Sequence, residues 1–267
     1  MTHDDWERLP RVVQHPLAIA HNMPNAILAS AGKGSVQNRG LKYKCEATTL
    51  EGFIQQLAVG YVARRYFFYV SGRVPRRLAP GEHDTRLLNK FDVARSKWSR
   101  YRRTKRQGPD GRPLGNVQYL RFRDFWVLLA TAGHHRFFQE HTQATSEGVD
   151  AVRQYKDVRR TPLVFGGYSI GHCNKLSVRI SRQAYRELKD HFLQLAQAYR
   201  TTDRLEQEFR RSPFEPYGGV TRQMFAVLRA VNRQRKTAGL PPVPPSCVRV
   251  KRRAVKPFAE PIYQLAA

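Results

Sequence analysis

Two short runs with a tight turn between them constrain the fold more than any other feature of the sequence. Residues 116–123 alternate in polarity, residues 125–131 are strongly apolar, and the turn consists of Arg123 and Asp124. Strands joined by so short a connection must pair antiparallel, because parallel strands need a long crossover. The sequence therefore predicts a β-hairpin here.

Further runs extend this hairpin into a sheet. Residues 161–170 and 176–181 flank the turn GHCNK and predict a second hairpin. The run 59–72, which holds Phe67 and Tyr69, is rich in β-branched and aromatic residues and predicts a central strand buried on both faces. Together these runs predict an α+β fold with a mainly antiparallel sheet of about five strands and helices packed on one face.

Helical periodicity marks several other segments. Thr49 and Asp84 are expected to cap two helices, and a helix from 220 to 237 is expected to end at Gly239. After Ser181, apolar residues recur at spacings of three and four, which is typical of an amphipathic helix. These residues are Tyr185, Leu188, Phe192, Leu195 and Tyr199.

The charge of the chain is strongly unbalanced. Lys and Arg number 47 against 21 Asp and Glu, which gives a net charge of +26. Self-repulsion on this scale opposes compaction, so the excess is typical of proteins whose partner is a polyanion. Residues 94–123 and 216–267 each hold ten basic residues and one acid. We therefore expect a nucleic acid, DNA rather than RNA, to bind through two basic regions.

Individual residues of these regions are candidate contacts. Cations neutralise phosphates, and exposed rings stack on unpaired bases. In the first region the candidates are Arg95, Lys97, Trp98, Arg100, Tyr101, Arg102, Arg103, Lys105, Arg106, Arg121 and Arg123. In the second region they are Arg229, Arg233, Arg235, Lys236, Arg249, Lys251, Arg252 and Arg253.

The composition also divides the chain into parts. Residues 1–48 lack periodicity and are expected to form a loose N-terminal arm. Residues 49–240 hold the periodic segments and are expected to form one α+β nucleic-acid-binding domain. Residues 241–267 begin with closely spaced prolines and continue as a basic sequence, so we expect a Pro-rich linker and a basic tail.

Histidines are the first candidates for catalysis. His134 and His135 follow the apolar strand, with His141 six residues further on and His172 in the next hairpin turn. Over these few residues the pair is similar to the HUH endonucleases of replication and transposition, whose two metal-binding histidines flank one hydrophobic residue. His134 and His135 are adjacent, so on a strand they would point to opposite faces. Only a bent loop, which Gly133 permits, would let both reach one ion.

Three functions remain open at this stage. The favoured one is nucleic-acid binding without catalysis, in the context of a mobile element or plasmid. The second is metal-dependent phosphodiester transfer by a replication initiator or transposase-like nickase, with Tyr217 as the candidate nucleophile. The third is a structural protein that binds an acidic protein. No cofactor is expected unless the chain is an enzyme, which would then need a divalent metal.

The sequence also bears on location. No apolar run approaches the length of a membrane span, and the acidic start of the chain does not resemble a signal peptide. The three cysteines are far apart and form no CxxC motif, which favours a reducing compartment. We expect a cytoplasmic protein with no membrane partner.

Overall fold

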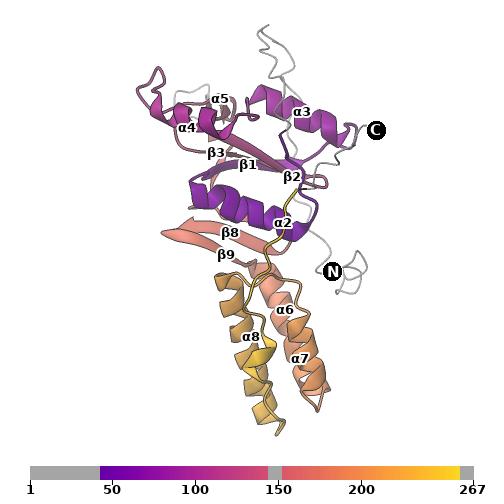
Figure 1. The fold of residues 1–267 in the computed structure, drawn as a ribbon. Helices are drawn as coiled ribbons and strands as arrows, with labels where there is room; N and C mark the ends of the chain where they lie inside the picture. Colours follow the sequence, from indigo (N-terminus) through magenta and orange to yellow (C-terminus); the bar gives the residue numbers. More distant parts are fainter. Residues whose placement is uncertain (1–42, 144–151, 259–267) are drawn as a thin grey trace, which may run out of the picture.

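A computed structural model describes residues 43–143 and 152–258 of the chain as a stack of helical and sheet layers (Figure 1). The helical elements are α2 (Leu50–Gln55), η2 (Gln56–Tyr61), η3 (Val62–Arg64), α3 (Pro80–Lys90), α4 (Lys97–Lys105), α5 (Arg136–Glu140), α6 (Arg182–Ala198), α7 (Asp203–Arg210), α8 (Gly218–Thr237) and η4 (Pro245–Cys247). The strands are β1 (Phe68–Arg73), β2 (Val117–Phe122), β3 (Phe125–Ala130), β4 (Thr142–Gln143), β5 (Val152–Arg153), β6 (Lys156–Asp157), β7 (Leu163–Phe165), β8 (Tyr168–Cys173) and β9 (Lys175–Ile180).

The predicted α+β class and the antiparallel pairing are confirmed, but the strands divide between two main sheets. The first sheet has the order β2-β3-β1-β6 and the second has the order β7-β8-β9. The hairpin around Arg123 and Asp124 is present as β2 and β3, and Arg123 takes a left-handed φ of 54° in its turn. The second predicted hairpin is instead a three-stranded meander, because Gly166 and Gly167 turn the chain between β7 and β8.

A helical segment separates the two sheets. Phe53, Ile54 and Leu57 are completely buried in one hydrophobic core with residues of both sheets, and α2 lies between the sheets in Figure 1. Thr49 caps α2 as predicted, with its Oγ1 accepting the Gly52 N–H at 3.0 Å. The strands therefore form two main sheets with α2 between them (Figure 1), instead of the single sheet of about five strands that we expected.

The first sheet is covered on both faces. Tyr69 and Leu129 belong to the core shared with α2, whereas Val70 and Leu128 belong to a second core with Phe91 and other residues around α3 and α5. This two-sided burial confirms the prediction that β1 is a central strand, although helices cover two faces instead of the single face expected. Alternate residues of β1, β2 and β3 pack into one core and then the other.

Two predicted boundaries are wrong. The strand expected over 59–72 is helical as far as Arg64 and becomes a strand only at Phe68, because Ala58, Tyr61 and Val62 continue the buried side of α2. Asp84 does not cap a helix. It lies inside α3, which begins at Pro80 with Ala79 as its N-cap, and its side chain is buried.

Three helices extend beyond the second sheet (Figure 1). Ser181 caps α6 as predicted, with its Oγ accepting the Ala184 N–H at 3.3 Å. The helix α8 packs against α6 and β9 and ends before Gly239, whose φ of 66° supplies the left-handed residue that such ends favour. The short helix α7, which has few apolar residues, was not predicted.

The Pro-rich segment and part of the basic tail are packed against the body. Val243, Cys247 and Val248 are buried, and further along the Gln55 Nε2 donates to the Val255 carbonyl at 2.7 Å. The described part of the tail is thus an integral part of the fold. Most of the predicted N-terminal arm and the last nine residues, 1–42 and 259–267, lie outside the described residues.

The burial of the cysteines gives a first test of this fold. Burial raises the pKa of Cys45 to about 12 and that of Cys247 to about 11, whereas Cys173 is exposed. Because only the thiolate reacts, we expect a maleimide to label Cys173 alone in the folded protein near neutral pH, and all three cysteines in urea. Peptide mass spectrometry would identify the sites, and rapid labelling of Cys45 or Cys247 without urea would contradict the fold.

Candidate nucleic-acid interface

The first basic region folds as α4, and arginines hold this helix to the first sheet. Ser96 caps the helix by accepting the Ser99 N–H at 3.1 Å. On its inner side, Arg103 donates from Nε and Nη2 to the Gly115 carbonyl, each at 3.1 Å. The Asn116 Nδ2 donates to the Arg100 carbonyl at 3.1 Å. These contacts fix α4 against the start of β2.

The outer side of α4 exposes aromatic rings. Trp98 is 73% exposed and Tyr101 is 56% exposed. Their ring centroids are 6.2 Å apart in an edge-to-face arrangement, and the Lys105 Nζ lies 5.8 Å from the Tyr101 ring. Positions separated by three or four residues share one side of a helix, so the rings and the cation form one continuous strip.

Unpaired cations surround these rings. The side chains of Lys97, Arg102, Lys105 and Arg106 are exposed and form no ion pair with the described residues. No acid occurs in α4 itself. We call the exposed side of this helix, with Lys97, Trp98, Tyr101, Arg102, Lys105 and Arg106, the α4 face.

Arg95 and Arg103 lie beneath the α4 face. Arg95 forms an ion pair with Asp92 and donates to the Ser99 hydroxyl at 3.3 Å. Burial, together with the nearby charge of Arg103, lowers the pKa of Arg95. Both arginines are half-buried and Arg95 is paired with Asp92, so they support the α4 face more than they extend its surface.

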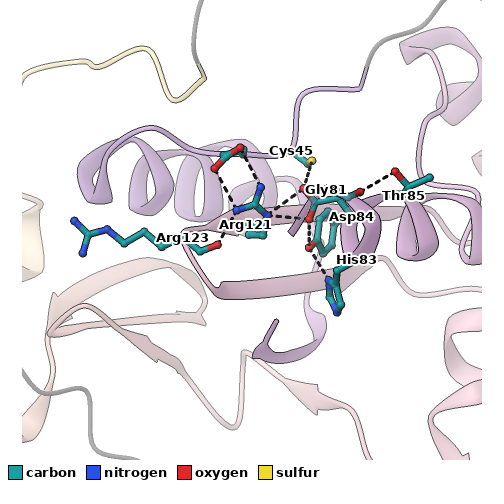
Figure 2. Close-up of polar contacts among 9 residues, drawn as sticks. Cys45, Gly81, His83, Asp84, Thr85, Arg121 and Arg123 are labelled. Atoms are coloured by element: carbon teal, nitrogen blue, oxygen red, sulfur yellow. Dashed lines mark hydrogen bonds and ion pairs between the residues drawn. The ribbon is translucent and has the colours of Figure 1, made fainter. Parts of the chain in front are cut away.

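Arg121 occupies a different environment from the one expected. Its side chain is only 5% exposed, and its Nε donates to the two carboxylate oxygens of Asp84 at 2.9 and 3.0 Å (Figure 2). Its Nη2 lies 3.0 Å from Glu46, and its Nη1 donates to the Arg123 carbonyl at 2.7 Å. Arg121 is therefore buried in contacts that stabilise the fold and is not exposed to a phosphate. Arg123 is exposed, at the opposite end of β2 from α4.

Some cations of the second basic region are buried or bound to the protein, and others are exposed. Arg235 is completely buried and donates to backbone carbonyls, so it too is unavailable to a ligand. Arg229, Arg233 and Lys236 are exposed on α8. In the tail, Arg249 donates to the Ser212 and Phe214 carbonyls and Arg252 to the Tyr217 hydroxyl at 3.2 Å. Lys251 and Arg253 are exposed.

The structure does not join the two basic regions into one surface. The helix α4 lies on the outer side of the first sheet with α3 and α5, whereas α8 packs against β9 of the second sheet (Figure 1). The two sheets and α2 lie between them. The two basic helices therefore lie on separate layers of the fold (Figure 1).

The histidine candidates do not converge. His135 caps α5, with its Nδ1 accepting the Phe137 N–H at 3.0 Å. Burial and the charges of Arg103 and Arg95 lower the pKa of His135 to about 4, so its ring is neutral at pH 7. His134 lies 3.5 Å from Asp110. Gly133 does bend the chain here, with a φ of 131°.

The other two candidate histidines contact aromatic rings. His141 stacks on Phe91 with centroids 5.7 Å apart, and His172 lies 4.7 Å from the Phe67 ring. Within residues 43–143 and 152–258, no three His, Cys, Asp or Glu side chains are arranged to hold a metal ion. The metal-dependent alternative therefore gains no support from this part of the chain.

Tyr217, the candidate nucleophile, precedes α8 as its N-cap residue. Burial raises the pKa of its phenol, although the hydrogen bond from Arg252 opposes this shift. The Arg252 guanidinium also lies 4.9 Å from the ring. The phenol is thus protonated at neutral pH and engaged with the tail, which does not favour a role as nucleophile.

Sequence reasoning missed some exposed cations. Arg222 lies on the exposed side of α8, seven residues before Arg229, and this helical spacing was visible in the sequence. Arg64 and Arg65 are exposed at the end of η3, next to the end of the first sheet where α4 is attached. Their position could not be predicted, because the segment was expected to be a strand.

Comparison with known proteins adds no further guide. No family model matches the chain, and neither a curated protein nor a solved structure does. Among the described residues, no helix combines the length and apolar character that crossing a membrane requires. A function must therefore be inferred from the chemistry of the chain's own surface.

Proposed function

We propose that the protein binds nucleic acid through the α4 face. The observation that carries this proposal is the exposure of two neighbouring rings, Trp98 and Tyr101, on a helix without acids. Exposing a Trp ring to water is unfavourable, and adjoining exposed apolar side chains rimmed by polar ones mark an interaction site. The lysines and arginines around the rings would neutralise phosphates while the rings stack on bases.

This chemistry favours an unpaired strand over a duplex. Stacking on a protein ring requires a base that is free of its own helix, and every base has a flat face, so such binding is tolerant of sequence. DNA is our expected strand, and binding without catalysis is our expected activity. A protein partner with an acidic surface would engage the cations but would not need two adjacent exposed rings.

Salt dependence of single-strand binding tests the proposal. Changing Lys97, Arg102, Lys105 and Arg106 to Ala is expected to weaken binding of a labelled strand at least about tenfold at low salt and to flatten the log–log salt slope by about 3, because each lost phosphate contact accounts for roughly 0.7. Fluorescence anisotropy across a salt series would measure both. DNA and RNA strands of equal length would show which sugar is preferred.

A matched control removes the same charge elsewhere. Changing four other arginines to Ala should leave the salt slope of strand binding nearly unchanged. These residues are exposed on or beside α6 and α7: Arg182, Arg186, Arg200 and Arg211.

Replacing the Trp98 ring tests stacking. Trp98→Ala should weaken strand binding by roughly 5- to 150-fold, because stacking on one base typically contributes about 1–3 kcal/mol. Equal losses in the α4 variant and the control variant, or no binding by the intact protein at low salt, would overturn the proposal.

A further inference from the structure

A second cationic surface lies on α8. Its exposed side chains include Arg222, Arg229, Arg233 and Lys236, at spacings of seven, four and three residues, so they line one side of the helix. We call these four side chains the α8 stripe. The α8 sequence contains no acid, and none of the four forms an ion pair with the described residues.

Neighbouring helices show that this pattern is not general. In α7 the exposed Arg210 pairs with Glu206 at 2.8 Å, and α6 carries Glu187 and Asp190 among its basic residues. Surface helices usually mix the two signs of charge in this way. The α8 stripe is therefore a local exception within the same group of three helices.

The chemistry of the α8 stripe differs from that of the α4 face. Fourteen helical steps separate Arg222 from Lys236, a rise of roughly 21 Å. No large aromatic side chain of α8 is exposed, since Phe225 is half-buried. Regularly placed cations without a stacking platform suit the backbone of a duplex, whose phosphates on each strand recur about every 3.4 Å along the axis.

Several layers of the fold separate the two surfaces. Between them lie the first sheet, α2 and the second sheet (Figure 1). Layers of this kind stack about 10 Å apart, and four such steps lead from α4 to α8, so the separation is on the order of 40 Å. The helices α4 and α8 lie at opposite ends of this stack of layers (Figure 1).

We propose that one chain binds two nucleic-acid segments at once, an unpaired strand at the α4 face and the phosphate backbone of a duplex at the α8 stripe. The first half of this inference rests on the proposed function, whereas the duplex site at α8 stands on its own observations. Simultaneous binding would place the protein at a junction between a duplex and an unpaired strand, or would let it bridge two separate molecules.

A three-component binding experiment with the full chain tests this inference. The probes are a single strand of roughly 12 nucleotides and a duplex of about 16 base pairs, each carrying one dye of an energy-transfer pair. With the intact protein we expect energy transfer between the probes and, by analytical ultracentrifugation, a complex of one chain, one strand and one duplex. Displacement of the strand by the duplex, or one probe per chain, would overturn the inference.

Variants separate the two sites. Changing the four residues of the α8 stripe to Ala should weaken duplex binding at least about tenfold and flatten its salt slope by about 3.6, at roughly 0.9 per phosphate, while strand binding changes less than about twofold. The α4 variant described above should show the reverse pattern. The control variant on α6 and α7 removes the same charge and should change neither.

The failures are distinguishable. If the α4 variant binds the strand normally while the α8 variant loses the duplex, the proposed function at α4 is wrong and the duplex site stands. If the α8 variant binds the duplex with an unchanged salt slope, this inference is wrong and the α4 function is unaffected. Circular dichroism would verify that each variant is folded, which is expected because all of the changed side chains are exposed.

Discussion

Replacing Asp84 with Ala is expected to lower the free energy of unfolding by about 3–5 kcal/mol, the range observed when one partner of a buried ion pair is removed. The Asp84 carboxylate is the acceptor of a buried network that joins α3 to β2 (Figure 2). It accepts from Arg121 Nε at 2.9 Å, from the Tyr119 hydroxyl at 2.7 Å and from the Cys45 thiol at 3.5 Å. Its loss leaves the Arg121 charge in a nearly dry site.

Glu46 provides a matched control for this prediction. It binds the same guanidinium, with its Oε1 and Oε2 at 3.2 and 3.0 Å from Arg121, but its side chain is 61% exposed. Exposed ion pairs contribute about 0–1 kcal/mol, so Glu46→Gln should cost less than about 1 kcal/mol. Urea denaturation followed by circular dichroism would measure both variants.

A double variant identifies the physical cause. If the cost of Asp84→Ala comes from an uncompensated charge, then combining Asp84→Leu with Arg121→Met should be less destabilising than Asp84→Ala alone, because replacing a whole buried pair by apolar groups is often nearly neutral. If the free energy of unfolding of Asp84→Ala is within about 1 kcal/mol of that of the intact protein, the network does not hold α3 to the sheet as inferred.

The same network shows where the sequence stops being informative. Asp84 precedes an apolar helical run and is a plausible helix cap, which is a local pattern. Its actual partner, Arg121, is 37 residues away, and nothing in the sequence links the two. Arg121 and Arg102 look alike within the first basic region, yet one is buried and the other exposed. Burial of a charge depends on an acid supplied by a distant element.

Apart from the cap expected at Asp84, signals carried within a few residues were reliable. The caps at Thr49 and Ser181 and the hairpin turn at Arg123 were predicted, because capping and tight turns depend on neighbours in sequence. Division of the strands between two sheets was not predicted. It depends on α2 lying between them, and burial of Tyr61 and Val62 against distant strands outweighs the β-propensity of that segment.

The sequence predicted which segment forms the candidate site, but it did not predict which side chains of that segment are exposed. The acid-free run that became α4 was visible at once, and so was the spacing that puts Trp98 and Tyr101 on one side. The attachment of Arg103 to the Gly115 carbonyl was not visible. That contact decides which side of α4 faces solvent, and hence which of its cations are available.

Arg235 shows that helical spacing can also exclude a candidate. It follows the buried residues Leu228 and Val231 by seven and four positions, so it lies on the inner side of α8, opposite the α8 stripe. Its Nε donates to the Pro241 carbonyl at 2.7 Å. Its Nη1 donates to the Ala196 and Tyr199 carbonyls at 3.0 and 2.6 Å, and its Nη2 donates to the Arg200 carbonyl at 2.9 Å.

Arg235→Ala is therefore expected to lower the free energy of unfolding by about 3–5 kcal/mol. Four carbonyl oxygens would lose their donor, and each buried polar group left unpaired costs about 1–3 kcal/mol, less where water enters. Three of these carbonyls lie at or just beyond the end of α6, where backbone acceptors have no partner within the helix. Urea denaturation would measure the loss, with Arg233→Ala, an exposed change on the same helix, expected to stay within about 0.5 kcal/mol.

Arg235→Lys separates the geometry of the guanidinium from its charge. A lysine keeps the positive charge but cannot present the planar fork that reaches carbonyls from both the α6 end and the Pro-rich segment. We expect an intermediate loss, with faster hydrogen exchange at the end of α6 and around Leu240, whose N–H donates to the Arg235 carbonyl at 2.8 Å. If Arg235→Ala is as stable as Arg233→Ala, then other contacts hold α8 against α6, and the α8 stripe does not depend on this buried arginine for its orientation.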